Sequence, residues 1–554
     1  MAQLREETQN DLSSGMYDST APTAFPKASA HLIYNGRIQP DGTVRRRSGT
    51  IRTTLAAANA EIGYGGTHFT TAGGTDQMLV ILGAKAYSST DKGVTLTERA
   101  TALREDYYDF AEIRVGATNY ICMANGAATI PTWTGAAWST IAGAPAGVKY
   151  LAAFNGRLWV TGHSGVLVQA CKIGDLTEWT SPDALTVQVD ALPTGLCNAG
   201  PHLLVFDRNS TSYIDGYGEQ TLIVATGSEG YSKSVGCVAF RSIQNVGDGA
   251  VCWLSERGVE YYHPSTGIVL VSKAVQKFMD SIDFDQIYNN PGRVTSAYDP
   301  TTQDYSLGLS TDGVRNNRVL VLNLRDNVDD QRKGKRAAPT IDRLQSPTSG
   351  DLLFGGGDDG YLEVVAGGAE LDADGDGYMI LADDYDYGDP IVADADGYFE
   401  ITTNDALPAT LFIAPATGKP TALYSLGYDG FVRRHYGVAS DDMLAAGTGG
   451  TQVAMTVRSR PFLVGRIKQK KRVRAVHVAS SQDTAATLSV SVVGRGTSTA
   501  AQTVTMSALG SDAAYRARIL TKFDADNPEV QVVTTGDVRI SLLGISAQLL
   551  KERV

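Results

Sequence analysis

The densest group of side chains that could do chemistry lies in the acidic, glycine-rich stretch 372–383, which reads DADGDGYMILAD. Its spacing matches an EF-hand-like calcium loop, in which positions 1, 3, 5, 7 and 12 supply oxygen ligands around a glycine at position 6. These positions fall on Asp372, Asp374, Asp376, Tyr378 (through its carbonyl) and Asp383, with Gly377 at the turn. Calcium takes six to eight hard oxygens, and alternate aspartates on a tight turn bring carboxylates together. The pattern predicts a calcium site, and solvated aspartates in a surface turn are the alternative.

The loop departs from the usual calcium motif at two points. Asp383 is shorter than the bidentate Glu usual at position 12, so we expect weak affinity or a neighbouring carboxylate in the shell. The segment after the loop is apolar and strand-like, so an isolated loop site is expected and no sensor. A second cluster, Asp394 and Asp396 before Gly397, has half the pattern and is more simply a solvated turn.

Enzyme motifs are scarce in the sequence. The GGGDDG run at 355–360 fits G-x-G-x-x-G, but a strand-like segment follows where a phosphate-binding helix would begin, and two aspartates would repel a pyrophosphate. No G-x-S-x-G elbow and no metal-binding histidine spacing is present. His163 and Ser164 are adjacent, and adjacent strand residues point to opposite faces, so a turn histidine is the simpler interpretation. No catalytic residue is therefore predicted.

Charge and cysteine content exclude further classes. A net charge of -12 argues against a protein that coats nucleic acid, because phosphate neutralisation needs a basic face. The five cysteines form no CxxC pair, which favours buried thiols over a zinc site or disulfide framework. The N-terminus is polar and lacks a secretion signal, and no apolar run is long enough to span a membrane. We expect synthesis in a cytoplasm.

A strand, a short polar or glycine turn and a second strand recur from about residue 75. Their starts lie roughly 40 to 50 residues apart, the period of four-stranded β-propeller blades. In GRLWVTG, Leu158 and Val160 share one face and Trp159 takes the other, as sheets stacked on both sides require. A set of β-sandwiches would show the same hairpins. The S-x-D-x-G-x-T spacing of an Asp-box turn also occurs, at Ser89, Asp91, Gly93 and Thr95.

The predicted fold class is all-β, with a β-propeller body, an acidic inserted segment and a C-terminal antiparallel β-sandwich-like domain. Strands in the last hundred residues alternate cleanly between polar and apolar side chains, as in a small sandwich. The expected boundaries are an extended N-terminal arm at 1–30, propeller body at 31–365, acidic insertion at 366–420, a return to the propeller at 421–450, and the C-terminal domain at 451–554. Two basic runs, 332–336 and 466–474, are either contact sites for DNA or an acidic partner, or solvated faces.

Four strings carry a resemblance to tail nozzle proteins of short-tailed bacteriophages, which include packaged-DNA stabilisation proteins and tubular tail proteins B. They are IYNGRIQPDGTVRRRSGT (33–50), LAAFNGRLWVTGHSG (151–165), LLVFDRNSTSYIDGYG (203–218) and GCVAFRSIQNVGDGAVCWLSERGVEYY (236–262). The likeness covers roughly residues 30 to 365 and includes Arg45 to Arg47 before Ser48 and Gly49, where the family usually has Arg-Pro-Gly. The acidic insertion matches nothing in this family.

The resemblance implies a hexameric ring of propellers in the virion tail, beneath a head-to-tail adaptor ring. Such a tube retains packaged double-stranded DNA and passes it into the host without reading its sequence, and tail fibres or spikes are further candidate partners. An acidic lumen would repel phosphates and let the duplex slide.

A second function stays open at this point. A propeller with an Asp-box also fits a sialidase-like or glycan-binding protein acting on host surface carbohydrate, in which arginines would clamp a sugar carboxylate. Arginine and tyrosine are plentiful but show no diagnostic spacing. A nozzle should assemble into a ring and hydrolyse nothing, whereas such an enzyme should work as a monomer.

Overall fold

Short apolar segments pair antiparallel with the next segment along the chain and build four-stranded sheets. In the described part of the chain, the computed structural model has six separate four-stranded sheets, and a seventh forms one end of a ten-stranded sheet. The structure describes residues 4–18, 21, 24–53, 61–216, 223–225, 232, 234–311, 316–324, 338–343, 391–393, 399–401, 408–416, 419–427, 431–435, 453–464, 470–482, 486–494, 497–506 and 515–549.

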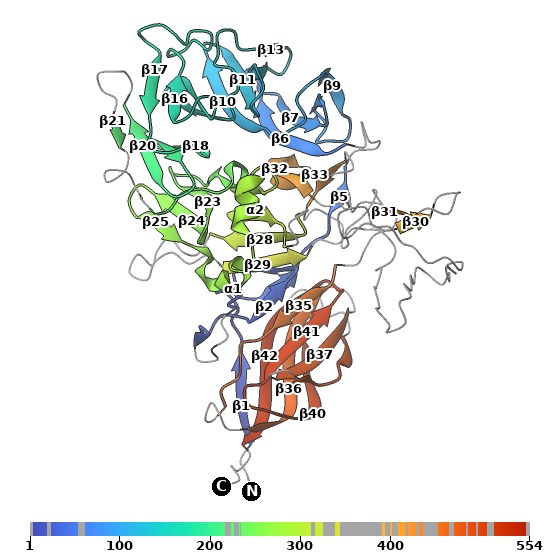
Figure 1. The fold of residues 1–554 in the computed structure, drawn as a ribbon. Helices are drawn as coiled ribbons and strands as arrows, with labels where there is room; N and C mark the ends of the chain where they lie inside the picture. The colour runs from blue at the N-terminus through green and yellow to red at the C-terminus, as the bar shows by residue number, and fades with distance from the viewer. Residues whose placement is uncertain are drawn as a thin grey trace, which may run out of the picture.

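These seven sheets are the blades of a β-propeller (Figure 1). The first blade consists of β6 (Gly63–Thr70), β7 (Asp76–Leu82), β8 (Lys85–Ser89) and β9 (Thr97–Ala100), and the second of β10 (Asp109–Val115), β11 (Thr118–Ala124), β12 (Pro131–Trp133) and β13 (Trp138–Thr140). The third blade consists of β14 (Tyr150–Phe154), β15 (Arg157–Thr161), β16 (Leu167–Ala170) and β17 (Leu185–Gln188), and the fourth of β18 (Gly195–Ala199), β19 (His202–Phe206), β20 (Thr211–Asp215) and β21 (Ile223–Ala225). The fifth blade consists of β22 (Gln244–Asn245), β23 (Val251–Ser255), β24 (Gly258–His263) and β25 (Gly267–Leu270), and the sixth of β26 (Thr295–Asp299), β27 (Asp304–Leu309), β28 (Arg318–Asn323) and β29 (Ala338–Arg343). The seventh blade consists of β32 (Pro408–Ala416), β33 (Lys419–Gly427), β34 (Val432–Arg434) and β5 (Ile51–Arg52).

The innermost strands close a ring around the propeller axis. In chain order β6, β10, β14, β18, β22, β26 and β32 each lie against the next, and β32 returns to β6. The last blade combines distant parts of the chain, because β5 pairs with β34 through Arg52 and Arg433. A strand from the N-terminal end of the chain therefore closes the ring.

Each blade buries both of its faces against its neighbours. Seven hydrophobic clusters occupy the seven gaps between adjacent blades. On β15, Leu158 and Val160 pack toward the second blade, while Trp159 packs toward the fourth. This arrangement confirms the two-faced pattern predicted for this strand, and the blade strands β7, β15 and β23 are buried almost throughout.

A β-sandwich adjoins the propeller and has alternating burial along its strands, such as β37. One of its sheets contains β1 (Leu4–Gln9), β3 (Gly36–Ile38), β4 (Val44–Arg46), β36 (Lys471–Gln482), β40 (Tyr515–Ala525) and β42 (Val538–Leu549). The other contains β2 (Leu32–Tyr34), β35 (Met455–Arg458), β37 (Ala486–Gly494), β38 (Thr497–Ser498), β39 (Gln502–Met506) and β41 (Glu529–Thr534), and continues the blade sheet of β26 to β29. A single core lies between them. The all-β class with propeller and C-terminal sandwich is thus confirmed.

The observed boundaries differ from those expected. The segment predicted as an extended arm contains β1, which pairs antiparallel with β42, and the predicted start of the propeller contains β2 to β4, which belong to the sandwich. The final blade begins at Pro408, inside the predicted insertion. The propeller is therefore inserted between two parts of the sandwich. A two-stranded sheet, β30 (Ile391–Ala393) with β31 (Phe399–Ile401), also falls within the predicted insertion.

Short helices follow the fifth blade. They are η4 (Ser272–Val275), α1 (Gln276–Met279) and α2 (Phe284–Asn289), and a single 3₁₀ turn, η3 (Phe240–Ser242), precedes that blade. Asp283 caps α2 by accepting a hydrogen bond from the Gln286 amide.

Candidate functional site

The propeller and the sandwich are joined by one continuous sheet. β2 pairs in parallel with β29 of the sixth blade through Tyr34 and Ile341, and antiparallel with β35 of the sandwich. Asn35, directly after β2, has a left-handed φ of 53° and donates its amide to the Ile341 carbonyl over 3.0 Å. Asn tolerates this conformation better than most residues. The turn at Asn35 thus sends the chain from the shared sheet into the opposite sheet of the sandwich.

A buried ion pair reinforces this junction. Arg37 on β3 donates from both terminal nitrogens to the two carboxylate oxygens of Asp342 on β29, over 2.8 and 2.5 Å. The side chain of Asp342 is fully buried and that of Arg37 is 17% exposed. Arg47, also buried, donates its Nε to the Asn35 side chain at 3.1 Å and lies 3.9 Å from Asp342. Two guanidinium groups therefore surround one buried carboxylate.

The other two arginines of the RRR motif point elsewhere. Arg46 donates to the Val453 carbonyl over 3.1 Å, at the start of the chain's return to the sandwich. Arg45 forms a two-bond ion pair with Asp537, and both of these side chains are about two-fifths exposed. The motif therefore ties the chain entering the propeller to strands near its C-terminal end. The three consecutive arginines stand out in the sequence, but nothing in it identifies their distant partners.

A second polar centre lies where the inner strands meet. Arg241, on the 3₁₀ turn before the fifth blade, donates to the Gly292 carbonyl at 2.6 Å and the Ala409 carbonyl at 3.1 Å. It also donates to the Thr410 hydroxyl at 2.5 Å. Its guanidinium lies 4.6 Å from the Tyr107 ring centroid. One arginine thus connects the second, fifth, sixth and seventh blades, and its donors are directed at backbone and hydroxyl groups of the protein.

Asp109 lies near this arginine, at the start of β10. Its carboxylate accepts hydrogen bonds from the Leu151 amide at 2.9 Å and the Phe110 amide at 3.0 Å. Asp109 is only partly buried as a residue, but the depth of its carboxyl group among the blades raises its pKa to about 7, against the opposing effects of these amides and Arg241. Burial also raises the pKa of the Cys197 thiol to about 12, so this thiol is un-ionised near neutral pH.

The predicted site residues have different outcomes. The calcium-loop residues, Asp372, Asp374, Asp376, Tyr378 and Asp383, lie outside the described residues, as do Asp394 and Asp396, the GGGDDG run and the basic run 332–336. The calcium site therefore stays a prediction. Four of the five cysteines are buried and Cys197 is partly buried, all with free thiols.

His163 and Ser164 do not form a base and nucleophile pair. The Nε2 atom of His163 lies 2.8 Å from the side-chain oxygen of Gln169. Burial lowers the pKa of His163, although this contact opposes the shift. The Ser164 carbonyl instead accepts the Leu167 amide, which closes the turn.

The Asp-box turn has the local bonding that its spacing predicts. Asp91 accepts hydrogen bonds from the Ser89 hydroxyl at 2.7 Å and the Thr95 amide at 2.9 Å, while Ser89 accepts the Gly93 amide at 2.9 Å. Gly93 has a φ of 84°, which favours glycine. These bonds stay within the turn, so its role in this blade is structural.

The described part of the second basic run, 470–474, lies at the start of β36. Arg472 forms a two-bond ion pair with Asp524 of β40, and Arg474 donates to the side chain of Gln548. Lys471 is buried and donates its ammonium to the Asp526 carbonyl. At least three of its cations are therefore engaged within the sandwich.

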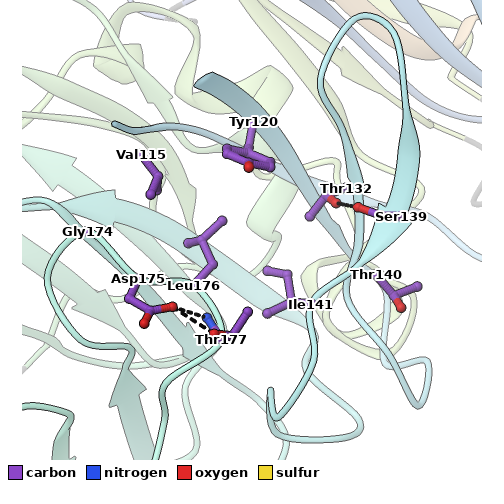
Figure 2. A pocket seen from close by; sticks show the side chains of 10 residues that line it. All are labelled: Val115, Tyr120, Thr132, Ser139, Thr140, Ile141, Gly174, Asp175, Leu176 and Thr177. Carbon is purple, nitrogen blue, oxygen red and sulfur yellow. Dashed lines mark hydrogen bonds between the residues drawn. The ribbon is translucent and has the colours of Figure 1, made fainter. Parts of the chain in front are cut away.

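A cavity of about 250 Å³ lies between the second and third blades, beside the outer strands β12 and β13 of the second blade (Figure 2). Val115, Ile141 and Leu176 give it apolar walls. Four of its polar side chains bond in pairs: Thr132 with Ser139 at 2.7 Å, and Asp175 with Thr177 at 2.8 Å. Small-molecule sites are usually larger and present polar groups that point at the ligand. This cavity gives no indication of a substrate.

Metal-binding clusters and membrane-spanning helices are both absent from the described regions. No group of three or more His, Cys, Asp or Glu is placed there to hold a metal ion. None of the helices described is both long enough and apolar enough to cross a membrane.

No protein-family model matches the chain, and no curated protein matches it. Among solved structures, the chain is similar to one described as "Structure of U3-55K", with 9% sequence identity and a TM-score of 0.38, over 70% of this chain and 98% of the other. It is also similar to "Crystal structure of RRP9 WD40 repeats", with 9% identity and a TM-score of 0.40, over 71% of this chain and 99% of the other. Likeness at this level carries no argument about what this protein does.

Proposed function

We propose that this protein is a structural subunit of the tail nozzle of a short-tailed bacteriophage. In this role a ring of copies, expected to be a hexamer, retains packaged DNA in the virion and provides the channel for its ejection. The proposal rests on the resemblance of residues 30 to 365 to such proteins. The structural observation that supports it is the continuous sheet that joins propeller and sandwich.

That junction suits a subunit that bears mechanical load. The blade sheet runs into the sandwich through β29, β2 and β35, and the buried pair of Arg37 and Asp342 spans the same place. Close-packed interiors resist compression and transmit strain, so such a subunit would move as one body. A chain whose two bodies were tethered by a flexible linker would make a poor wall for a pressurised tube.

The charge of the protein supports the same role. A channel for DNA should repel phosphates enough for the duplex to slide, and the chain carries a net charge of -12. In the described part of the basic run at 470–474, several cations already have partners in the sandwich. They are therefore less available to hold the phosphate backbone.

The partners follow from this assignment. A head-to-tail adaptor ring would contact one end of the nozzle, and tail fibres or spikes are candidates for attachment to its outside. Double-stranded DNA would pass through without sequence recognition. The protein would be made in the host cytoplasm and would act in the virion tail.

Electron microscopy of the purified protein, alone and mixed with the cognate adaptor and portal, tests the proposal. We expect a six-fold ring that ends the assembly. A protein that stays monomeric and ignores the adaptor would overturn the proposal. Release of sialic acid or retention of host glycans by that monomer would instead support the sialidase-like or glycan-binding alternative.

A further inference from the structure

Among the described strands, one sheet of the sandwich ends in two edge strands on opposite sides. Where β1 pairs with the second half of β42, the strand order is β1, β42, β36 and β40, and each strand pairs antiparallel with the next. Figure 1 shows β1 on one side of the sandwich and β40 on the other. Within the described ranges, β1 pairs only with β42 and β40 only with β36. In the part of the chain that the structure describes, no further strand pairs with the outer edge of either one.

Open edges of this length are unusual in a protein that stays monomeric. β40 runs from Tyr515 to Ala525 without proline. The Gln502 side chain donates one long hydrogen bond, 3.4 Å, to the Leu520 carbonyl of this strand. Long, uninterrupted edge strands invite pairing with another chain, and monomers usually protect them. β40 lacks proline, although Arg518, Lys522 and Asp524 place charges on its exposed face.

Exposed apolar side chains mark the same two edges. Five large hydrophobic side chains are exposed among the described residues, and two of them are Leu4 on β1 and Leu520 on β40. Leu520 is 70% exposed, the most exposed of the five. Both belong to the outer face of the sheet. The alternate side chains of β40, such as Ile519 and Phe523, pack against the sandwich core, so Leu520 points away from it. Leu4 pairs with Gln548 of β42, which is partly exposed. Covering them would remove apolar surface from water.

The two edges also differ in charge. On the outer face of β40, the exposed Arg518 and Lys522 flank Leu520, and neither forms an ion pair in the part of the chain described. On β1, the exposed Glu6 lies between Leu4 and Thr8 on that face, where it accepts a bond from the Ser546 hydroxyl. Opposite charges on facing strands stabilise a sheet, and like charges destabilise it.

Strand direction permits the two edges to meet in a ring. Four antiparallel strands alternate in direction, so β1 and β40 of one copy run in opposite senses. Rotation about an axis along the strands preserves those senses, so β40 of one copy would meet β1 of the next in antiparallel orientation. The outer face of the sheet would remain outermost in every copy. Such a contact is heterologous and closes into a ring when the rotation does.

We propose that neighbouring copies of this chain join by pairing the free edge of β40 with the free edge of β1 of the next copy. The proposal deepens the nozzle assignment and rests on it, because it names the contact that makes the ring. Closure would leave no open edge in this part of the sheet. Six copies would give about twenty-four strands, and barrels of about 16 to 18 strands already enclose an aqueous channel.

A symmetric dimer through β40 alone is the competing arrangement. It would also be antiparallel, but it would bring Arg518 and Lys522 of both copies together. That contact concentrates four positive charges beside Leu520, whereas the β40 to β1 contact places Glu6 among them. The charges therefore favour the heterologous pair.

Site-directed crosslinking of the full chain tests this contact. One protein carries Glu6→Cys, and a second carries Arg518→Cys, Leu520→Cys or Lys522→Cys, because the stagger between copies can shift by two residues while keeping the same face. After the two proteins are mixed under assembly conditions and oxidised, we expect a crosslinked dimer from at least one combination and none from either protein alone. Leu192→Cys, an exposed leucine of the propeller, is the matched control and should not crosslink to Glu6→Cys.

A second variant tests the energetics of the edge. Leu520→Lys keeps the strand but adds charge at its exposed centre, and we expect the ring population to fall about tenfold, with the thermal unfolding temperature of the monomer unchanged. A ring that forms without crosslinks and tolerates Leu520→Lys would overturn the edge contact while leaving the nozzle assignment intact. Crosslinks from Leu520→Cys alone would favour the symmetric dimer and overturn the proposal. A wild-type protein that never forms a ring, even with adaptor and portal, would overturn both.

Discussion

The carboxylate of Asp342 accepts two hydrogen bonds from the guanidinium of Arg37, although 305 residues separate them in the sequence. Arg37 lies in the sandwich and Asp342 on the outermost strand of the sixth blade. A charge buried without a partner is costly, so each side chain needs the other in place. Their relative positions therefore fix the sandwich against the propeller.

Replacing Arg37 with alanine tests the role of this pair. The change leaves the buried carboxylate of Asp342 without its two-bond partner, and we expect the free energy of unfolding to fall by about 3 to 5 kcal/mol. Urea denaturation followed by tryptophan fluorescence measures the loss. The Arg45→Ala variant is the control, because the pair with Asp537 is solvent-exposed and should contribute only about 0 to 1 kcal/mol. Equal losses in the two variants would contradict this account.

Arg241 should be irreplaceable even by lysine. Its planar guanidinium reaches the carbonyls of Gly292 and Ala409 and the Thr410 hydroxyl together, and the single ammonium of lysine lacks that fork. We expect Arg241→Lys to lower the free energy of unfolding by about 2 to 4 kcal/mol, because buried acceptors lose charged donors. Arg114→Lys on the exposed surface of β10 should change stability by less than about 0.5 kcal/mol. If Arg241→Lys leaves the free energy of unfolding unchanged, the hydrogen bonds of Arg241 do not hold the blades together.

Part of this architecture follows from the sequence, because its signals are local. Period-two alternation correctly predicted that Leu158 and Trp159 lie on opposite faces of their strand. The spacing of Ser89 and Asp91 correctly predicted the hydrogen bonds within one turn. Both depend on residues within a few positions of each other. The blade period likewise depends on turns that recur along the chain.

The remaining features depend on partners far away in the chain. β1 is polar because it is an edge strand with only Gln9 buried, so its sequence resembles that of a solvated arm. Nothing near Arg37 indicates Asp342. Arg241 offers one weak signal, a lone arginine directly after the apolar run CVAF, but the carbonyls that it binds belong to other blades.

The stability of the propeller should depend on the protonation of Asp109. Its pKa in the folded protein is about 7, above the value near 3.9 expected for an unfolded chain. The folded state therefore holds the proton more tightly, and the stabilisation is full below about pH 4 and is lost as pH rises through about 7. We expect Asp109→Asn to flatten this part of the pH profile, as measured by urea denaturation between pH 5 and 8. Parallel profiles for wild type and variant would show that Asp109 does not titrate in this range.

The Asp-box turn gives a prediction with the opposite pH sign. Partial burial opposes ionisation of Asp91, but bonds from the Thr95 amide and the Ser89 hydroxyl hold its pKa below the usual value. Its stabilisation is thus present above about pH 4 and is lost as pH falls through the lowered folded-state pKa. We expect Asp91→Ala to cost about 1 kcal/mol at pH 7 and less at pH 3. A cost that stays constant across this range would assign the effect to packing rather than to the carboxylate.

Calcium should bind the loop that begins at Asp372, because three alternate aspartates on one glycine-rich turn repel each other unless a cation or water separates them. Isothermal titration of the full chain should give a calcium heat that disappears in a variant with Asp372→Ala and Asp376→Ala. At a calcium concentration about 100 times the dissociation constant, the bound form should gain about 2.7 kcal/mol, which heating scans with and without chelator would detect. Asp394→Ala and Asp396→Ala together make the matched control, since that cluster has half the motif and should leave the heat unchanged. If the wild type shows no calcium heat, or if both double variants lose it equally, the carboxylates at 372–376 are not a specific calcium site.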